Sequence, residues 1–336
     1  MKTELDKLQQ KKNITRGQMQ ALMTEIMSGR MSEDDMRNFL VYLNEKGPTV
    51  EEITGAALIM RRFVLPIQAD GDVVLDTCGT GGDGKHTFNI STVAAIVAAA
   101  AGVEVAKHGN RSVSSRCGSA DVLERLGVRI DLSHERVQEC LRTVGIAFMF
   151  AQSHHPAMKH ISAVRKALGV KTIFNVLGPL TNPARATHQM MGVYSRQLVE
   201  QMAHVHRNLG ARRVVVAHGA DGLDEITTAD RTWIADFNGK DVVLSDISPE
   251  DFGLTRASES DLKGGDVGDN AEIALAILKG EKGPRRDIVL LNTAFALYAA
   301  ERVSNPRAGL TLAAETIDAG RAMLKLEELK EFTNRV

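Results

Sequence analysis

Cysteine is scarce in this sequence of 336 residues, and the three that occur, Cys78, Cys117 and Cys140, show no C-x-x-C spacing. This pattern suggests neither a zinc knuckle nor a disulfide framework. The formal net charge is −1, so the chain lacks the basic field that attracts nucleic acid or anionic lipid. The N-terminal residues form no apolar signal region, and no apolar run is long enough to cross a bilayer. These absences predict a soluble, cytoplasmic protein with neither nucleic-acid nor membrane partners.

Two common nucleotide-binding motifs are missing as well, because no Gly-Lys-Ser/Thr closes a P-loop and no third glycine completes a Gly-x-Gly-x-x-Gly fingerprint. The chain has instead a glycine-rich segment, residues 76–92, between a short apolar run at 73–75 and an alanine-rich run at 93–101. Backbone N–H groups converge on anions in such strand–loop–helix turns. The glycines and the donors that follow them are Gly79, Gly81, Gly82, Gly84, Asn89, Ser91 and Thr92. We interpret this segment as a phosphate-binding loop, the alternative being a tight turn without a ligand.

The pattern of apolar residues changes near residue 70. Before it, apolar residues recur at helical spacing, and Ser32 and Thr49 carry the signals of capped helix starts. After it, short apolar runs alternate with helical stretches, which is typical of a mostly parallel sheet covered by helices. The predicted strands are 73–75, 103–106, 146–150, 214–217, 242–244 and 288–291, and the predicted helices include 119–126, 133–144, 195–209 and 270–279.

The predicted fold class is therefore α/β, with a small all-helical domain and a large α/β domain whose mostly parallel central sheet has helices on both faces. Residues 1–70 are expected to form the helical domain, joined by part of 155–190, where three prolines interrupt the alternation. Residues 71–154 and 191–336 are expected to form the α/β domain. Ligands of such folds lie beyond the carboxyl ends of the strands, so the loops after the first four predicted strands should surround one crevice.

Cations and hydroxyl groups are concentrated in the loop after the second predicted strand, residues 107–121. Lys107 lies directly at the strand end, and Arg111, Arg116 and several serines follow it. Point charges together with hydroxyl groups suit a dense anion such as pyrophosphate. For Arg111 and Arg116 a solvated basic loop is an equally good interpretation.

Acidic residues follow the fourth predicted strand, where Asp221 precedes the adjacent pair Asp224 and Glu225. Adjacent carboxylates at a strand end bind a hard cation well, and magnesium commonly bridges such groups to substrate phosphates. An exposed acidic turn is the alternative, and Asp221 fits it best.

Histidines and an arginine mark the segment 152–165, but no cysteine or carboxylate there completes a zinc ligand set. We therefore expect packing or wall positions for its histidines. Arg165 could bind a carboxylate through two parallel hydrogen bonds, and a structural salt bridge is equally compatible with the spacing.

Together these motifs resemble the anthranilate phosphoribosyltransferase family, which acts in tryptophan synthesis. The resemblance covers nearly the whole chain, in the blocks 29–32, 46–49, 79–83, 89–92, 107–110, 119–121, 155–158, 175–183 and 224–225. Cys117 is a departure, since serine is more usual there. The resemblance implies a homodimer formed through the helical domains. It also implies transfer of ribose phosphate from phosphoribosyl pyrophosphate (PRPP) to the amine of anthranilate, with Mg²⁺, two ions per active site.

The resemblance further implies roles for individual residues. PRPP is expected to contact Gly79, Gly82, Asp83, Thr87, Asn89, Ile90, Ser91, Thr92, Lys107, Ser115 and Ser119. Mg²⁺ is expected on Ser91, Asp224 and Glu225. Anthranilate is expected on Gly79, Asn110 and Arg165, with His108 and His155 near its path. Lys107 and Arg165 are the expected catalytic residues, through charge stabilisation and orientation, and no strong general base is expected.

Two other functions are compatible with the same arrangement of a helical domain and an α/β domain. A pyrimidine nucleoside phosphorylase-like enzyme would share the Gly-Thr-Gly-Gly loop, but it has no use for the pair Asp224 and Glu225 or for the block 175–183. A non-catalytic nucleic-acid-binding relative conflicts with the near-zero net charge.

Overall fold

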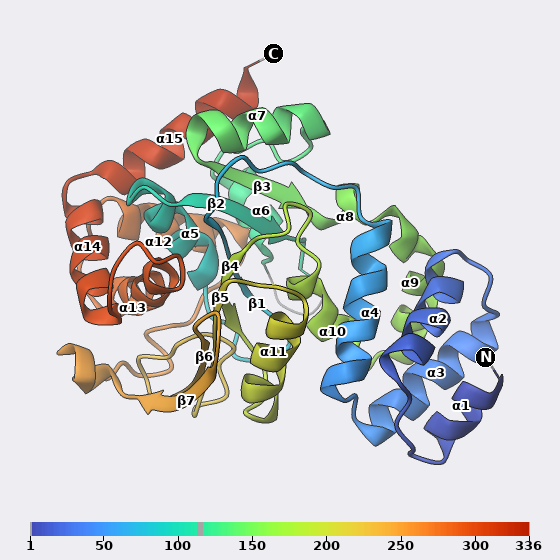
Figure 1. The fold of residues 1–336 in the computed structure, drawn as a ribbon. Helices are drawn as coiled ribbons and strands as arrows, with labels where there is room; N and C mark the ends of the chain where they lie inside the picture. Colours follow the sequence, from blue (N-terminus) through green and yellow to red (C-terminus); the bar gives the residue numbers. More distant parts are fainter. Residues whose placement is uncertain (1, 113–116, 336) are drawn as a thin grey trace.

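A helical bundle lies beside a sheet covered by helices in the computed structural model, which describes residues 2–112 and 117–335 (Figure 1). The bundle contains α1 (Lys2–Gln9), α2 (Arg16–Met27), α3 (Glu33–Lys46) and α4 (Val50–Phe63), and α9 (Lys159–Leu168) packs against α2 and α3. The capped helix starts are confirmed, because the hydroxyls of Ser32 and Thr49 accept backbone N–H groups at the starts of α3 and α4.

Within the described residues, seven strands form one sheet, in the order β3-β2-β1-β4-β5-β6-β7. Their bounds are β1 Val74–Gly79, β2 Glu104–Gly109, β3 Ile146–Phe150, β4 His188–Gly192, β5 Arg213–Gly219, β6 Thr232–Phe237 and β7 Val242–Ile247. The first five strands pair in parallel, and β6 and β7 extend the sheet in antiparallel fashion. The predicted mostly parallel sheet is therefore confirmed, and the carboxyl ends of β1 to β5 meet along one edge.

Helices cover both faces of this sheet. The longer ones are α5 Ile90–Ala100, α6 Ser119–Arg125, α7 His134–Val144, α11 Gln197–Asn208, α12 Val267–Leu278, α13 Pro284–Ala299, α14 Pro306–Asp318 and α15 Arg321–Asn334. Short turns of helix are α8 Ala151–His154, α10 Phe174–Leu177, η1 Pro156–Met158, η2 Gly178–Leu180 and η3 Pro249–Phe252. None of the helices in the described ranges is long and apolar enough to span a membrane.

Strand β5 divides its side chains between two hydrophobic cores. Val215 and Ala217 pack in the core that contains α5 and α13. Val214 and Val216 face the other way, into a core that continues through α11 into the helical bundle. The bundle and one face of the sheet therefore share a continuous apolar core, as expected for a buried strand whose successive side chains point to opposite faces.

Three elements of the structure differ from the prediction. Strands β4 and β6 were not predicted, and the predicted strand at 288–291 is wrong, because these residues lie inside α13. Helix α13 packs against both α5 and α14, so nearly all of its side chains are buried. A helix buried on all sides presents the same continuous apolar run as a buried strand, which is why periodicity could not separate them.

Candidate active site

Residues from β1, β2, the start of α5 and the loop after β5 converge at the carboxyl edge of the sheet. The Lys107 Nζ of β2 donates to the carbonyl of Thr77 at 2.6 Å and lies 3.4 Å from the hydroxyl of Ser91 at the start of α5. From the loop after β5, Asp224 Oδ2 accepts the N–H of Gly81 at 2.6 Å. Three of the predicted loops are thus in direct contact.

The glycine-rich loop after β1 approaches Asp224 so closely that a larger residue could not be accommodated. A Cβ added at Gly79 would collide with the carboxylate of Asp224 and lie 2.9 Å from its carbonyl oxygen. Gly82 has a φ of +77°, in the left-handed region that favours glycine. Gly79 therefore allows the acidic loop to contact the end of β1, and Gly82 allows the turn of the glycine-rich loop.

Two polar atoms at the start of α5 have no partner among the residues that the structure describes. Asn89 Oδ1 and Thr92 Oγ1 are buried, and within the described residues neither makes a hydrogen bond. Asn89 donates through Nδ2 to the carbonyl of Cys117 at 3.3 Å, which orients its side chain. Buried polar atoms normally have partners, so these two atoms, which lie beside the glycine-rich loop, are available to a polar ligand.

Three carboxylates lie close together beside this helix start. Burial, followed by the charges of Asp83 and Glu225, raises the pKa of Asp224 well above its ordinary value. Burial raises the pKa of Glu225 to about 7, although the charge of Lys107 and hydrogen bonds from Ser91 lower it. The protein thus supplies too little positive charge for these buried carboxylates, and a bound cation would balance them.

No three His, Cys, Asp or Glu side chains in the described ranges group as a complete metal cage. A cation held by Asp224 and Glu225 would therefore need further oxygen ligands from water or from a substrate. That is the usual situation for Mg²⁺, which keeps several waters and binds one or two carboxylates together with phosphate oxygens.

Asp76 lies beneath the site and was not predicted from the sequence. It is fully buried and accepts hydrogen bonds from the His108 N–H at 3.2 Å, Asn182 Nδ2 at 2.9 Å and Gln189 Nε2 at 3.2 Å. Burial raises the pKa of Asp76, and the charge of Lys107 is the main opposing effect. A charged residue in the apolar strand β1 was the signal that could have identified it.

The residues predicted near the acceptor form a second group. His108 Nε2 and His155 Nε2 are 3.1 Å apart. Burial lowers the pKa of both, that of His155 to about 4, so the pair is uncharged at neutral pH. Asn110 accepts the Arg111 N–H at 2.8 Å and lies 3.4 Å from Gln152 Nε2.

Arg165 on α9 has its guanidinium 5.1 Å from the centre of the Phe174 ring, and burial lowers its pKa. No carboxylate in the described part of the chain forms an ion pair with it. The structural salt bridge considered as an alternative is therefore not formed there, and the guanidinium is free to bind an anionic group.

Other predicted residues are less directly involved. Arg111 is paired with Asp121 and Glu124, which fits the solvated loop better than a ligand contact. The turn at Asp221 is held by the N–H of Leu223 and the hydroxyl of Thr227. The Ser119 hydroxyl donates to the carbonyl of Asn110, Thr87 forms an isolated antiparallel bridge with Lys263, and Ile90 begins α5. Ser115 and Arg116 lie outside the described residues.

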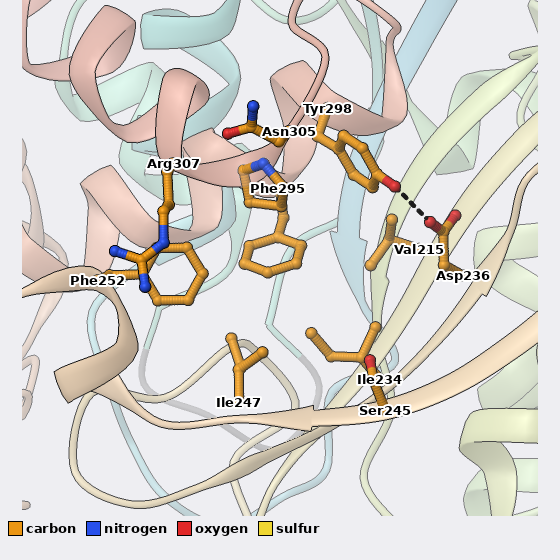
Figure 2. A pocket seen from close by; sticks show the side chains of 11 residues that line it. Val215, Ile234, Asp236, Ser245, Ile247, Phe252, Phe295, Tyr298, Asn305 and Arg307 are labelled. Atoms are coloured by element: carbon orange, nitrogen blue, oxygen red, sulfur yellow. Dashed lines mark hydrogen bonds between the residues drawn. The ribbon is translucent and has the colours of Figure 1, made fainter.

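A separate cavity of about 350 Å³ lies between strands β5–β7 and helices α13 and α14 (Figure 2). Its lining is largely apolar and aromatic, with the Tyr298 hydroxyl donating to Asp236 at 2.8 Å. None of the predicted site residues lines this cavity, so it is distinct from the group at the carboxyl edge of the sheet.

Comparison with known proteins shows similarity along nearly the whole chain. Residues 2–64 match the helical bundle domain of a glycosyl transferase family, and residues 71–323 match the a/b domain of that family. The anthranilate phosphoribosyltransferase of Geotalea uraniireducens is 49% identical over 348 aligned residues, with 99% of each chain covered.

Two solved structures with this activity in their names have the same fold. The crystal structure of anthranilate phosphoribosyltransferase from Thermus thermophilus has a TM-score of 0.93 and 41% identity, covering 98% of this chain and 99% of that one. The Saccharomyces cerevisiae enzyme in complex with PRPP and Mg has a TM-score of 0.90 and 27% identity, covering 100% of this chain and 99% of that one. The chain described here therefore belongs to the anthranilate phosphoribosyltransferase family.

Proposed function

We propose that this protein transfers the phosphoribosyl group of PRPP to the amine of anthranilate, giving N-(phosphoribosyl)anthranilate and pyrophosphate in tryptophan biosynthesis. The observation that carries the proposal is the convergence of a glycine-rich loop, Lys107 and two buried carboxylates at one edge of the sheet. Full-length similarity to enzymes of this name favours it over a pyrimidine nucleoside phosphorylase and over a non-catalytic nucleic-acid-binding relative.

PRPP binding is assigned to the glycine-rich loop, the start of α5 and the loops after β2. The residues proposed are Gly79, Gly82, Asp83, Thr87, Asn89, Ile90, Ser91, Thr92, Lys107, Ser115 and Ser119. The unpartnered atoms of Asn89 and Thr92 support this assignment, because a polar ligand would satisfy both. Lys107 supports it as well, since it is a buried cation near the carboxyl end of β2.

Mg²⁺ is assigned to Ser91, Asp224 and Glu225, with two ions per active site. The chemistry of these side chains fits, because they offer hard oxygen ligands and two of them are buried carboxylates in need of a counter-charge. Bound there, Mg²⁺ would neutralise the charge of the pyrophosphate leaving group.

Anthranilate is assigned to Gly79, Asn110 and Arg165, with His108 and His155 beside its path. Arg165 suits the carboxylate of anthranilate, because it is half-buried and has no carboxylate partner of its own in the described ranges. The two histidines are uncharged at neutral pH, so they would form a polar wall without competing with Arg165 for the carboxylate.

The proposed mechanism depends on position and charge. The amine lone pair of anthranilate forms the bond to C1 of the ribose while the bond from C1 to pyrophosphate breaks, and the amine proton leaves to solvent. Lys107 stabilises the charge that develops on the leaving oxygen, and Arg165 holds the amine in line with C1. An aryl amine is already neutral at neutral pH, so the step needs no strong general base.

The test is the loss of anthranilate fluorescence with PRPP and Mg²⁺ for the wild type and for Asp224→Asn/Glu225→Gln. We expect Mg²⁺-dependent consumption by the wild type and a loss of about a hundredfold or more in the double variant. Folded wild-type protein that leaves anthranilate unchanged would overturn the proposal. Phosphate-dependent release of thymine would then favour the phosphorylase, and salt-dependent binding to single-stranded DNA the nucleic-acid-binding relative.

Assembly and location are further parts of the proposal. A homodimer formed through the helical domain and a cytoplasmic location are both inferred from the family. Light scattering should give about twice the chain mass of 36.5 kDa. A mass equal to one chain at micromolar concentration would contradict the dimer.

A further inference from the structure

Lys171 is a cation that lies against the glycine-rich loop although it comes from a distant part of the chain. It belongs to the connector between α9 and α10, and α9 packs against the helical bundle. A Cβ added at Gly82 would lie 3.1 Å from Lys171 Cε and 3.7 Å from its Nζ. The side chain of Lys171 therefore reaches the loop to which PRPP is assigned.

Tyr194 holds the ammonium group in this position. Lys171 Nζ is 3.9 Å from the centre of the Tyr194 ring, which is the geometry of a cation–π contact. The backbone N–H of Tyr194 donates to the hydroxyl of Thr80 at 3.1 Å, so the backbone that carries this ring is itself anchored to the glycine-rich loop. Lys171 thus has a defined place over the loop without needing a carboxylate there.

The other cations of these loops that the structure describes already have partners. Lys85 pairs with Glu259 at 2.9 Å, and Arg111 pairs with Asp121. Lys107 donates to the carbonyl of Thr77 and offsets the charge of Asp76. Lys171, by contrast, forms no ion pair within residues 2–112 and 117–335. PRPP carries a phosphate at one end and a pyrophosphate at the other, so cationic side chains besides Lys107 and the proposed Mg²⁺ have phosphate oxygens to contact.

We propose that Lys171 is a PRPP-binding residue, whose ammonium group contacts phosphate oxygens held by the loop at Gly82. The inference rests on the proposed function and adds a phosphate ligand that comes from the connector after α9. It predicts that removal of the Lys171 charge weakens PRPP binding and leaves anthranilate binding unchanged. Lysine acts here as a point charge, so arginine should replace it in part.

The experiment compares Lys171→Met with Lys171→Arg and with Lys166→Met, which removes the same charge from the exposed end of α9. Steady-state kinetics with each substrate varied should show the KM for PRPP raised about tenfold in Lys171→Met, with the KM for anthranilate within about twofold of wild type. Lys171→Arg should recover most of the affinity, and Lys166→Met should resemble wild type. Tyr194→Leu should raise the KM for PRPP about threefold, because the ammonium loses its anchor.

Calorimetric titration with pyrophosphate and Mg²⁺ measures the same contact without turnover. Lys171→Met should weaken pyrophosphate binding about tenfold, with an unchanged melting temperature of the free protein. Unchanged PRPP and pyrophosphate affinities in Lys171→Met would overturn the inference, as would a rise confined to the KM for anthranilate. A wild type that binds pyrophosphate but never consumes anthranilate would defeat the proposed function, and the binding titration would still decide the role of Lys171.

Discussion

At the scale of single residues, several polar groups of this site lack the neighbouring charge or hydrogen-bond partner that buried polar groups usually have. Asp224 and Glu225 are buried with too little neighbouring positive charge, and Asn89 keeps an unpartnered oxygen. Such groups cost stability in the free protein and recover it when a ligand arrives. The histidine pair is the opposite case, since His108 and His155 are held uncharged by burial.

Burial of His155 predicts an acid-sensitive contribution to stability. Its pKa is lowered from 6.5 to about 4 in the folded protein, so between these values the unfolded chain binds a proton that the folded chain does not. The free energy of unfolding therefore falls as the pH drops through this window, by at most about 3 kcal/mol for this one residue. Urea unfolding between pH 4 and pH 7 should show a weaker pH dependence in His155→Asn than in wild type.

The control for that measurement is His86→Asn, which removes an exposed histidine with a φ of +55° that asparagine tolerates. Its pH dependence should match the wild type. If the stability of His155→Asn shows the same pH dependence as that of the wild type, the burial of His155 does not cause the loss of stability at low pH.

Sequence position was enough to predict which residues near a strand end or a helix start lie at the carboxyl edge of the sheet. Lys107 lies near the end of β2, and Asn89 precedes α5, so local pattern placed both at the carboxyl edge of the sheet. Asp76 and Lys171 were missed for a different reason. Their surroundings are made by contacts with segments far away in the chain, at Asn182 and Gly82, which no local pattern contains.

At the scale of elements, the valine-rich strand β5 was predictable and β4 was not, and β6 was missed although it contains Thr232 and Ile234. Strand β5 reads Arg-Val-Val-Val-Ala-His-Gly, whereas β4 reads His-Gln-Met-Met-Gly and has no β-branched residue. In β4 the polar side chains His188 and Gln189 are buried, and their positions depend on tertiary partners such as Asp76. Propensity alone therefore could not identify this strand.

Helices α3 and α4 are joined by a buried ion pair that yields a prediction for the bundle. Lys46 Nζ lies 2.8 Å from Glu52 Oε2, and the two side chains are 4% and 0% exposed. Glu52 also accepts the N–H groups of Ile14 and Thr49. Lys46→Met would leave a buried carboxylate without its counter-charge, and we expect a loss of about 3 kcal/mol in the free energy of urea unfolding.

Arg37→Met is the matched control, because it removes an exposed cation from the same helix, α3. It should change the free energy of unfolding by less than about 0.5 kcal/mol. Equal stability of Lys46→Met and Arg37→Met would contradict the importance of the buried pair.

On the scale of the whole molecule, the two hydrophobic cores meet in the sheet. Strand β5 contributes Val214 and Val216 to the core that reaches the bundle, and Val215 and Ala217 to the other. The bundle and one face of the sheet pack into one hydrophobic core. The domain boundary near residue 70 therefore stays a prediction. Because the bundle and the sheet share this core, we expect the two to unfold together.

Ligand binding at the edge of the sheet should therefore stabilise the whole molecule. PRPP with Mg²⁺ at about 100 times its dissociation constant adds about 2.7 kcal/mol, which raises the melting temperature of a chain of this length by about 4 °C. Differential scanning calorimetry should show one transition that moves as a unit, and Mg²⁺ alone should move it less. The double variant Asp224→Asn/Glu225→Gln should show almost no shift with PRPP and Mg²⁺. Two transitions, of which PRPP moves only one, would mean that the bundle and the sheet unfold independently despite their common core.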